Sequence, residues 1–267
     1  MAAIKSRRQR NRPAKARSHQ RPAGELLYGR QAVREALRAA RRHFYELFLA
    51  QGLKANDVVH EIQQWAQKRA LAVHQHPREQ LDAWLPGVNH QGVVLRASPY
   101  PYAQVDAMLA RAQTVAASPF LLLLDRVQDP QNLGALFRAA EAFGVHGVIL
   151  PRHRAAHITP AVVNASAGAV EHLLVATATN LVTEMKALKK AGLWIAGLEA
   201  REDAVALEDV DLGGPLAVVV GSEGFGLSRL VAETCDWLVM LPMRGRINSL
   251  NASVAGSVFL FEAMRAR

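Results

Sequence analysis

The chain has 267 residues, which fits one large domain or two modest ones, and half of them are hydrophobic, so a packed core is possible and wholesale disorder is excluded. Its single cysteine, Cys235, excludes an internal disulfide framework and a cysteine-cluster metal site and suits a reducing compartment, so we expect a cytoplasmic protein without a metal. The formal net charge is +9, and no apolar run approaches the ~18 residues of a membrane span, so no membrane association is expected.

The positive charge is concentrated in residues 1–24, which contain no acidic residue. The basic residues of this segment are Lys5, Arg7, Arg8, Arg10, Arg12, Lys15, Arg17 and Arg21. The rest of the chain holds 24 basic and 23 acidic residues and is nearly neutral. We predict that 1–24 is a disordered basic tail that binds a polyanion such as RNA. A transit peptide or a mere solubility segment remains open, whereas the tail lacks the apolar core of about 7–15 residues that a secretory signal requires.

Residues 25–97 are predicted to form a small N-terminal α/β domain. Apolar residues at helical spacing predict helices over 29–42, 58–70 and 78–85. Strands are predicted over 45–50, 71–73 and 92–97. Residues 98–119 begin with a proline-containing stretch and are predicted to be a linker, within which 104–111 form a helix.

Residues 120–267 are predicted to form a second, larger α/β domain. Its strands are predicted over 120–124, 145–150, 194–198, 216–220 and 237–241, and its helices over 132–143, 160–172, 182–191, 228–234 and 249–265. Because the strands at 121–124 and 218–220 are continuously apolar, we expect a sheet covered by helices on both faces.

The stretch GSEGFG at 221–226 follows a buried strand and precedes a helix, the position at which α/β folds bind ligands. Its glycine spacing is not that of the dinucleotide fingerprint, and Leu227 stands where a P-loop requires lysine. Glu223 further disfavours a phosphate. The stretch therefore indicates a pocket for a ligand that carries hydroxyl groups or positive charge, and a plain strand-to-helix turn is the alternative.

The stretch DRVQDPQNLGALFR at 125–138 also leaves a buried strand. Asp129 and Asn132 can cap the following helix. Arg138 comes six residues after Asn132, and helix positions six apart do not share a face, so the two side chains point differently unless Asn132 precedes the helix. A solvated helix arginine is the alternative interpretation of Arg138.

The stretch LPMRGRINSLNAS at 241–253 leads from a strand through a glycine turn into the last helix. Asn248, Ser249 and Asn251 are all suitable N-caps, and capping alone could account for them. Because one cap is enough, the additional polar side chains beside free backbone N–H groups indicate a site able to bind a polar ligand.

Together, and in this order, the three stretches resemble the signature motifs of the SpoU/TrmH family of RNA 2′-O-ribose methyltransferases. NLGALFR at 132–138 resembles the first motif, GSEGFG at 221–226 the second, and LPM at 241–243 with SLNASVA at 249–255 the third. The resemblance covers 120–267. GRQAVREAL at 29–37 resembles the start of the substrate-binding domain in the branch that modifies 23S ribosomal RNA.

This resemblance implies an α/β fold with a SPOUT-type, trefoil-knotted domain that binds S-adenosylmethionine (SAM), preceded by a smaller α/β RNA-binding domain. It implies a homodimer with the last helix in the interface. The backbone at three positions is implied to hold SAM, namely Gly221, Leu241 and Leu250. Five side chains are implied to line the catalytic site, namely Asn132, Arg138, Glu223, Ser249 and Asn251.

The predicted activity is therefore transfer of a methyl group from SAM to a ribose 2′-hydroxyl of structured RNA, with a guanosine of 23S rRNA as target. Arginine is a poor base because it holds its proton tightly, so we expect Arg138 to fix the RNA phosphate and the 2′-oxygen. A tRNA target, an antibiotic-resistance methylation of rRNA and a non-enzymatic ribosome-assembly factor are the alternatives. A nucleotide-dependent enzyme is disfavoured by the missing P-loop lysine and dinucleotide fingerprint.

Overall fold

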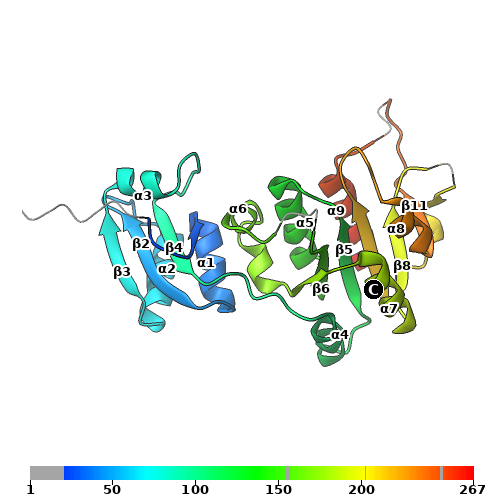
Figure 1. Cartoon of the computed structure of the whole chain (residues 1–267), viewed down its shortest axis with the longest axis horizontal. Coiled ribbons are helices and arrows are strands. Elements are labelled where there is room, and N and C mark those ends of the chain that lie inside the picture. The colour runs from blue at the N-terminus through cyan, green and yellow to red at the C-terminus, as the bar shows by residue number, and fades with distance from the viewer. Residues whose placement is uncertain (1–20, 154–156, 202, 247–248) are drawn as a thin grey trace, which may run out of the picture.

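The computed structural model describes residues 21–153, 157–201, 203–246 and 249–267. Within these ranges the chain forms two β-sheets that occupy the two lobes of an elongated molecule (Figure 1). Most of the predicted basic tail, residues 1–20, and the candidate cap Asn248 lie outside the described residues. No helix in the described ranges is long and apolar enough to cross a membrane.

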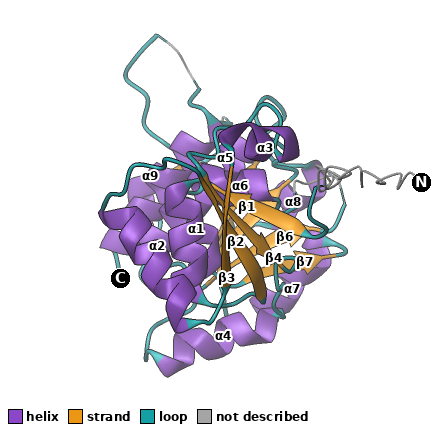
Figure 2. Ribbon diagram, turned by 90° about the vertical axis from the view of Figure 1, so that its left-hand side faces the viewer, coloured by secondary structure: helices purple, strands orange, loops and turns teal. Residues whose placement is uncertain are grey.

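The N-terminal sheet has four strands in the order β1 (Glu25–Tyr28), β4 (Val93–Ala97), β2 (Phe44–Ala50) and β3 (Ala72–His76). β4 pairs antiparallel with β1 and β2, and β3 pairs parallel with β2. Helices α1 (Arg30–Ala39) and α2 (Asp57–Lys68) cover one face, and α3 (Arg78–Trp84) covers the other (Figure 2). Strand alternation explains this division, because Leu47 and Leu49 pack with α1 and α2, whereas Phe48 packs with Trp84 of α3.

The second sheet has seven strands, and every pairing between neighbours is parallel. The order is β7 (Val175–Ala178), β6 (Gly147–Pro151), β5 (Phe120–Asp125), β10 (Leu216–Gly221), β8 (Trp194–Leu198), β11 (Trp237–Met240) and β9 (Val205–Ala206). The chain adds β6 and β7 on one side of β5, and β10 and β8 lie on its other side. The order of the strands therefore reverses at β5 and β10, a topology that leaves a crevice at their carboxyl ends.

Helices cover both faces of this sheet, as the apolar strands predict. Leu122 and Leu124 of β5 pack in one core with α5 (Pro130–Ala142) and α9 (Ala252–Arg265). Leu121 and Leu123 pack in another with α4 (Val105–Thr114), α7 (Leu181–Lys190) and α8 (Arg229–Thr234). All four leucines are fully buried, and each contributes about 1.5–3 kcal/mol of hydrophobic stabilisation.

The structure differs from the predicted elements at several points. The helix expected over 160–172 is broken into α6 (Pro160–Ala165) and the 3₁₀ helix η1 (Ala169–His172), because Ala167 (φ 53°) and Gly168 (φ 88°) take left-handed conformations. Strands β1, β7 and β9 were not predicted. The last helix begins at Ala252 rather than at residue 249, and Asn251 is its N-cap.

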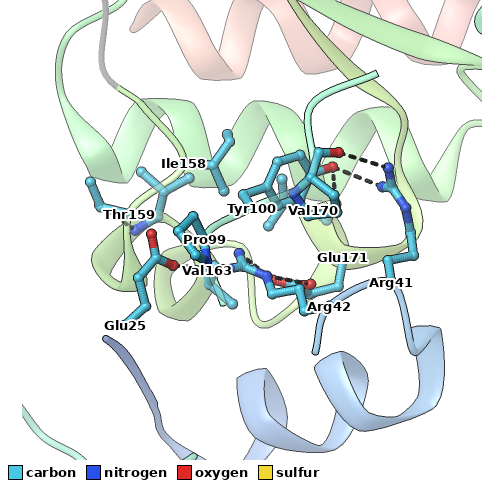
Figure 3. A network of polar contacts seen from close by, with 12 residues as sticks. Glu25, Arg41, Arg42, Pro99, Tyr100, Ile158, Thr159, Val163, Val170 and Glu171 are labelled. Carbon is cyan, nitrogen blue, oxygen red and sulfur yellow. Dashed lines mark hydrogen bonds and ion pairs between the residues drawn. The ribbon is translucent and has the colours of Figure 1, made fainter. Parts of the chain in front are cut away.

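The two lobes are joined by a buried polar network as well as by the connecting chain (Figure 3). Arg42, which follows α1, contacts Glu171 of η1 through Nη2–Oε1 at 2.8 Å and Nε–Oε2 at 3.0 Å, and both side chains are fully buried. Its Nη1 also donates to Glu25 of β1 at 2.6 Å. Arg41 donates to the hydroxyl of Tyr100, which donates to the Leu173 carbonyl oxygen at 2.6 Å. The N-terminal lobe is therefore held in one orientation by charge-assisted hydrogen bonds.

Candidate cofactor and active site

A pocket of about 510 Å³ lies at the carboxyl ends of β8, β10 and β11, beside the reversal in strand order. Its walls come from segments that are distant in sequence, namely 198–200, 220–226, 240–243 and 249–255. Its volume is within the ~300–1,000 Å³ typical of small-molecule sites, and its position is the usual ligand position of a doubly wound sheet.

The loop at 221–226 forms one wall of this pocket as a closed turn. The Ser222 N–H donates to the Gly226 carbonyl oxygen at 3.1 Å, and the Gly226 N–H donates back to Ser222 at 3.0 Å. Gly226 has φ 60°, in the left-handed region that glycine occupies without strain. A Cβ at Gly221 would lie 2.3 Å from the carbonyl carbon and oxygen of Gly226, so only glycine fits there.

Two carboxylates that the sequence analysis did not single out anchor the segment that follows this loop. Glu199, directly after β8, accepts from the Leu227 N–H at 2.7 Å and also lines the pocket. Asp125, at the end of β5, is buried and accepts from the Ser228 N–H at 2.6 Å. An acidic residue directly after a buried apolar strand is the signal that could have identified both, because such a carboxylate requires a hydrogen-bond partner.

The three motifs meet in a hydrogen-bonded network of Asn132, Glu223 and Asn251. The Asn132 amide donates to Glu223 Oε2 at 3.0 Å, and the Asn251 amide donates to Glu223 Oε1 at 2.7 Å and to Asn132 Oδ1 at 2.9 Å. Asn251 Oδ1 in turn accepts from the Ser253 N–H at 2.9 Å and the Val254 N–H at 3.2 Å, which caps α9. Asn251 is thus both the N-cap of α9 and a member of this network.

The structure brings together seven of the eight predicted site residues. Those that line the 510 Å³ pocket are Gly221, Glu223, Leu241, Ser249, Leu250 and Asn251. Asn132 lines an adjoining pocket of about 340 Å³ and reaches the first pocket through the network.

Arg138 is the predicted site residue that does not join the others within one chain. Asp129 is the N-cap of α5 and Pro130 its first residue, so Asn132 lies inside the helix and cannot share a face with Arg138. Asn132 is buried, whereas Arg138 is exposed and has no hydrogen-bond or ion-pair partner among the described residues. Asn132 therefore does not precede the helix, and its side chain and that of Arg138 do not meet within one chain.

The pocket's chemistry suits a ligand that combines positive charge, hydroxyl groups and an apolar ring. Leu198, Met240 and Leu250 supply apolar surface, and the carboxylates of Glu199 and Glu223 supply acceptors. No lysine or arginine among the described residues lines it, so a phosphate would have no counter-charge. SAM, which has a sulfonium centre, a ribose and an adenine, fits this set of donors and acceptors.

The fold and this site define a methyltransferase of the SpoU type, and comparison with known families agrees. Residues 119–261 match the SpoU rRNA Methylase family, and residues 26–103 match the family described as RNA 2′-O ribose methyltransferase substrate binding. The chain therefore belongs to the SpoU family of RNA methyltransferases, as its motifs predict.

Curated relatives align with most of this chain. It is 40% identical over 245 residues to the putative TrmH family tRNA/rRNA methyltransferase YacO of Bacillus subtilis (strain 168), an alignment that covers 91% of this chain and 96% of that protein. It is 43% identical over 266 residues to an uncharacterized tRNA/rRNA methyltransferase of Mycobacterium sp. (strain KMS), covering 100% of this chain and 83% of that protein.

Two solved structures with bound AdoMet share the fold over 90% of this chain. The AdoMet-bound rRNA methyltransferase from Sinorhizobium meliloti has a TM-score of 0.74 at 25% identity, covering 90% of this chain and 87% of that one. The methyltransferase AviRb from Streptomyces viridochromogenes, in complex with AdoMet, has a TM-score of 0.73 at 23% identity, covering 90% and 89%. These neighbours confirm the predicted α/β methyltransferase fold with its N-terminal domain. AdoMet is bound in both of those structures, and SAM is the cofactor predicted for this chain.

Proposed function

We propose that this protein transfers the methyl group of SAM to a ribose 2′-hydroxyl of structured RNA, and that its target is a guanosine of 23S rRNA. The observation that carries the proposal is the hydrogen-bonded network of Asn132, Glu223 and Asn251 in the wall of a pocket that suits SAM. Three motifs converge there, and a protein that only binds RNA has no need of that arrangement in the wall of a small-molecule pocket.

The pocket residues divide into those that hold the cofactor and those that hold the acceptor. The backbone at Gly221, Leu241 and Leu250 would hold SAM, which supplies an electrophilic methyl group on a sulfonium centre. Ser249 and Asn251 would orient the acceptor ribose. The trefoil knot implied by the family would bring the segment 241–251 to this position.

Arg138 is proposed to bind the RNA phosphate next to the target, and that phosphate would accept the proton that the 2′-hydroxyl loses as its oxygen bonds to the methyl carbon. Arginine remains a cation at neutral pH, which suits this positioning role and not that of a base. Positioning of this kind contributes several kcal/mol to lowering the barrier.

Because Arg138 lies away from the pocket of its own chain, we propose that a second copy supplies it in a homodimer. α5, which carries Arg138, packs along α9. Val254, Val258 and Phe261 of α9 remain 49%, 41% and 40% exposed, an apolar face that a second copy would cover.

The test is methyl transfer from tritiated SAM to bulk rRNA, with SAM binding measured by calorimetry. Arg138→Ala should lower the transfer rate by about 10²-fold or more and leave the SAM affinity unchanged. A near wild-type rate would overturn the role of Arg138.

A mixture of two inactive variants tests whether the arginine acts across the dimer. Arg138→Ala and Asn251→Ala chains, each inactive alone, should regain about a quarter of the wild-type rate after denaturation and mixing, because half of the random dimers have one intact site. An inactive mixture with normal dimerisation would place Arg138 and Asn251 in the same chain's site.

RNA recognition is proposed to come from residues 25–97 and from the basic tail, residues 1–24, joined to the catalytic residues 120–267 through the linker 98–119. The near-neutral charge of the rest of the chain and the substrate-binding family match of residues 26–103 support this division. Mapping 2′-O-methyl sites in RNA from a deletion strain tests the target. A missing methyl in tRNA would overturn the 23S target and leave the reaction class intact.

A further inference from the structure

The 340 Å³ pocket lies next to the cofactor pocket and shares a wall with it. Ser222, Glu223 and Ala252 line both cavities, so a molecule in one is separated from the other by a single layer of side chains. The second pocket adds Arg126 and Phe225, which play no part in the site described above. A group in this second pocket would be next to the network formed by Asn132, Glu223 and Asn251.

Phe225 presents its ring to solvent from a closed turn. Its side chain is 83% exposed, the largest value for a bulky hydrophobic residue in the described chain. The paired hydrogen bonds between Ser222 and Gly226 close the turn that carries it, which holds the backbone of Phe225 beside the pocket. An exposed aromatic ring next to a cavity of this size is suited to stacking on a flat base, an interaction worth about 1–3 kcal/mol.

Two features of Arg126 indicate that it binds a ligand. Its backbone has φ 61°, a left-handed conformation that costs a non-glycine residue about 1–3 kcal/mol. Its Nε is buried without a hydrogen-bond partner among the described atoms and makes only a long ion pair, at 3.5 Å, with Asp125 Oδ1, while 37% of the side chain is exposed. The guanidinium therefore retains donors for an incoming acceptor at the rim of the pocket.

We propose that this second pocket receives one nucleotide of the RNA, the target itself, with its base stacked on Phe225 and its phosphate bound by Arg126. The target, and not a neighbour, is favoured because the shared wall places the ribose of this nucleotide against Asn132 and Glu223. The inference rests on the proposed methyl transfer to RNA and adds the subsite that would hold the reacting nucleotide out of the base stack.

The acidic side of the pocket indicates which base edge it accepts. Asp129 lines this pocket together with Arg126, and among the described residues only its Oδ2 is engaged, by the Asn132 N–H that it caps. Carboxylate oxygens accept hydrogen bonds and repel phosphate, so they suit the N–H donors of a guanine edge. The phosphate then lies on the Arg126 side of the cavity.

Substitutions at Phe225 test the stacking through kcat/KM for RNA. Using tritiated SAM and rRNA from a deletion strain, Phe225→Ala should lower kcat/KM for RNA by about 5–150-fold, and Phe225→Trp should stay within about threefold of wild type. The SAM dissociation constant should not change. Leu230→Ala, which removes an exposed side chain on α8, is the matched control and should behave as wild type. A wild-type kcat/KM for Phe225→Ala, or equal losses for the alanine and tryptophan variants, would overturn the proposal.

Arg126→Gly separates binding from folding, because glycine relieves the left-handed strain. This variant should unfold at the same or higher urea concentration and yet lose at least about tenfold in kcat/KM, with a weaker salt dependence of RNA binding. An unchanged kcat/KM would overturn the assignment of Arg126.

Ultraviolet crosslinking of bound rRNA gives a readout that does not depend on turnover. Mass spectrometry should find a nucleotide attached to the peptide that contains Phe225. If other peptides carried abundant crosslinks and this peptide carried none, the subsite would be overturned. If wild-type protein methylated no RNA, the proposed function itself would fail, a result distinct from an active wild type with an equally active Phe225→Ala variant.

Discussion

Replacing Arg42 by methionine should be among the most damaging single substitutions outside the site. The change keeps much of the aliphatic volume and removes the guanidinium that contacts Glu171 at 2.8 and 3.0 Å. Glu171 is fully buried, so its carboxylate would be left without a counter-charge in a medium that solvates it poorly.

The expected loss is about 3–5 kcal/mol, the range measured when one partner of a buried ion pair is removed. That is at least about a fifth of the total stability of about 5–15 kcal/mol typical of a folded domain. By contrast, the pair of Arg229 and Glu233 on α8 is largely exposed, and Arg229→Met should change the unfolding free energy by less than about 1 kcal/mol.

The loss should depend on pH in a defined direction. Burial raises the pKa of Glu171 above its ordinary value, and the Arg42 guanidinium acts against that rise. A raised folded-state pKa means that the contribution of Glu171 to stability is fully present below the unfolded pKa of about 4.3 and decreases as pH rises through the folded value. Without Arg42 the pKa rises further, so the difference between variant and wild type should grow from pH 4.5 to pH 8.

Urea unfolding at several pH values, followed by circular dichroism, measures this difference. The double variant Arg42→Met with Glu171→Leu should recover most of the lost stability, because an apolar pair replaces an ion pair at little cost. If Arg42→Met lost less than about 1 kcal/mol at pH 8, or if its deficit did not change with pH, the buried charge would not govern this junction.

Three further outcomes are expected. Gly221→Ala should weaken SAM binding at least about tenfold by displacing the 221–226 turn, whereas Gly214→Ala, whose Cβ meets nothing within 4 Å, should bind as wild type in calorimetry. Asn251→Asp should keep the cap of α9, which is worth about 1 kcal/mol in urea unfolding. It should lose methyl transfer, because a second carboxylate would face Glu223. Full activity of this variant would contradict the role of the network. Deleting 1–24 should reduce the salt slope of RNA binding by up to about 7, with unchanged SAM affinity, and equal slopes for both chains would exclude the tail from RNA binding.

The central strands could be predicted from the sequence, because a run such as 121–124 is apolar on both faces and can only be buried. β1 and β7 were missed because four residues give too short a pattern to distinguish a strand from a loop. The break at Gly168 was missed for a tertiary reason: a Cβ there would lie 2.6 Å from Glu35 of α1, so the close approach of the two lobes requires glycine.

The site was predicted as a set of residues but not as an arrangement. Hydrogen bonds join Glu223 to Asn132 and Asn251, which are 91 and 28 residues away, and no local spacing determines such contacts. Only family resemblance placed them together. The direction of Arg138 did follow from local geometry, once Pro130 and Asp129 fixed where the helix starts. Phe225 carried no signal, since an exposed aromatic residue acquires meaning only beside a pocket.

The network at the pocket wall has only one possible polarity. Asn251 Oδ1 accepts from two backbone N–H groups of α9, so its amide cannot rotate by 180° without turning both contacts into donor–donor repulsions. Its N–H₂ group must therefore face Glu223 and Asn132 before any ligand enters. The dipoles of this wall are set when α9 folds, and a reacting group meets them already aligned, with little reorganisation energy left to supply.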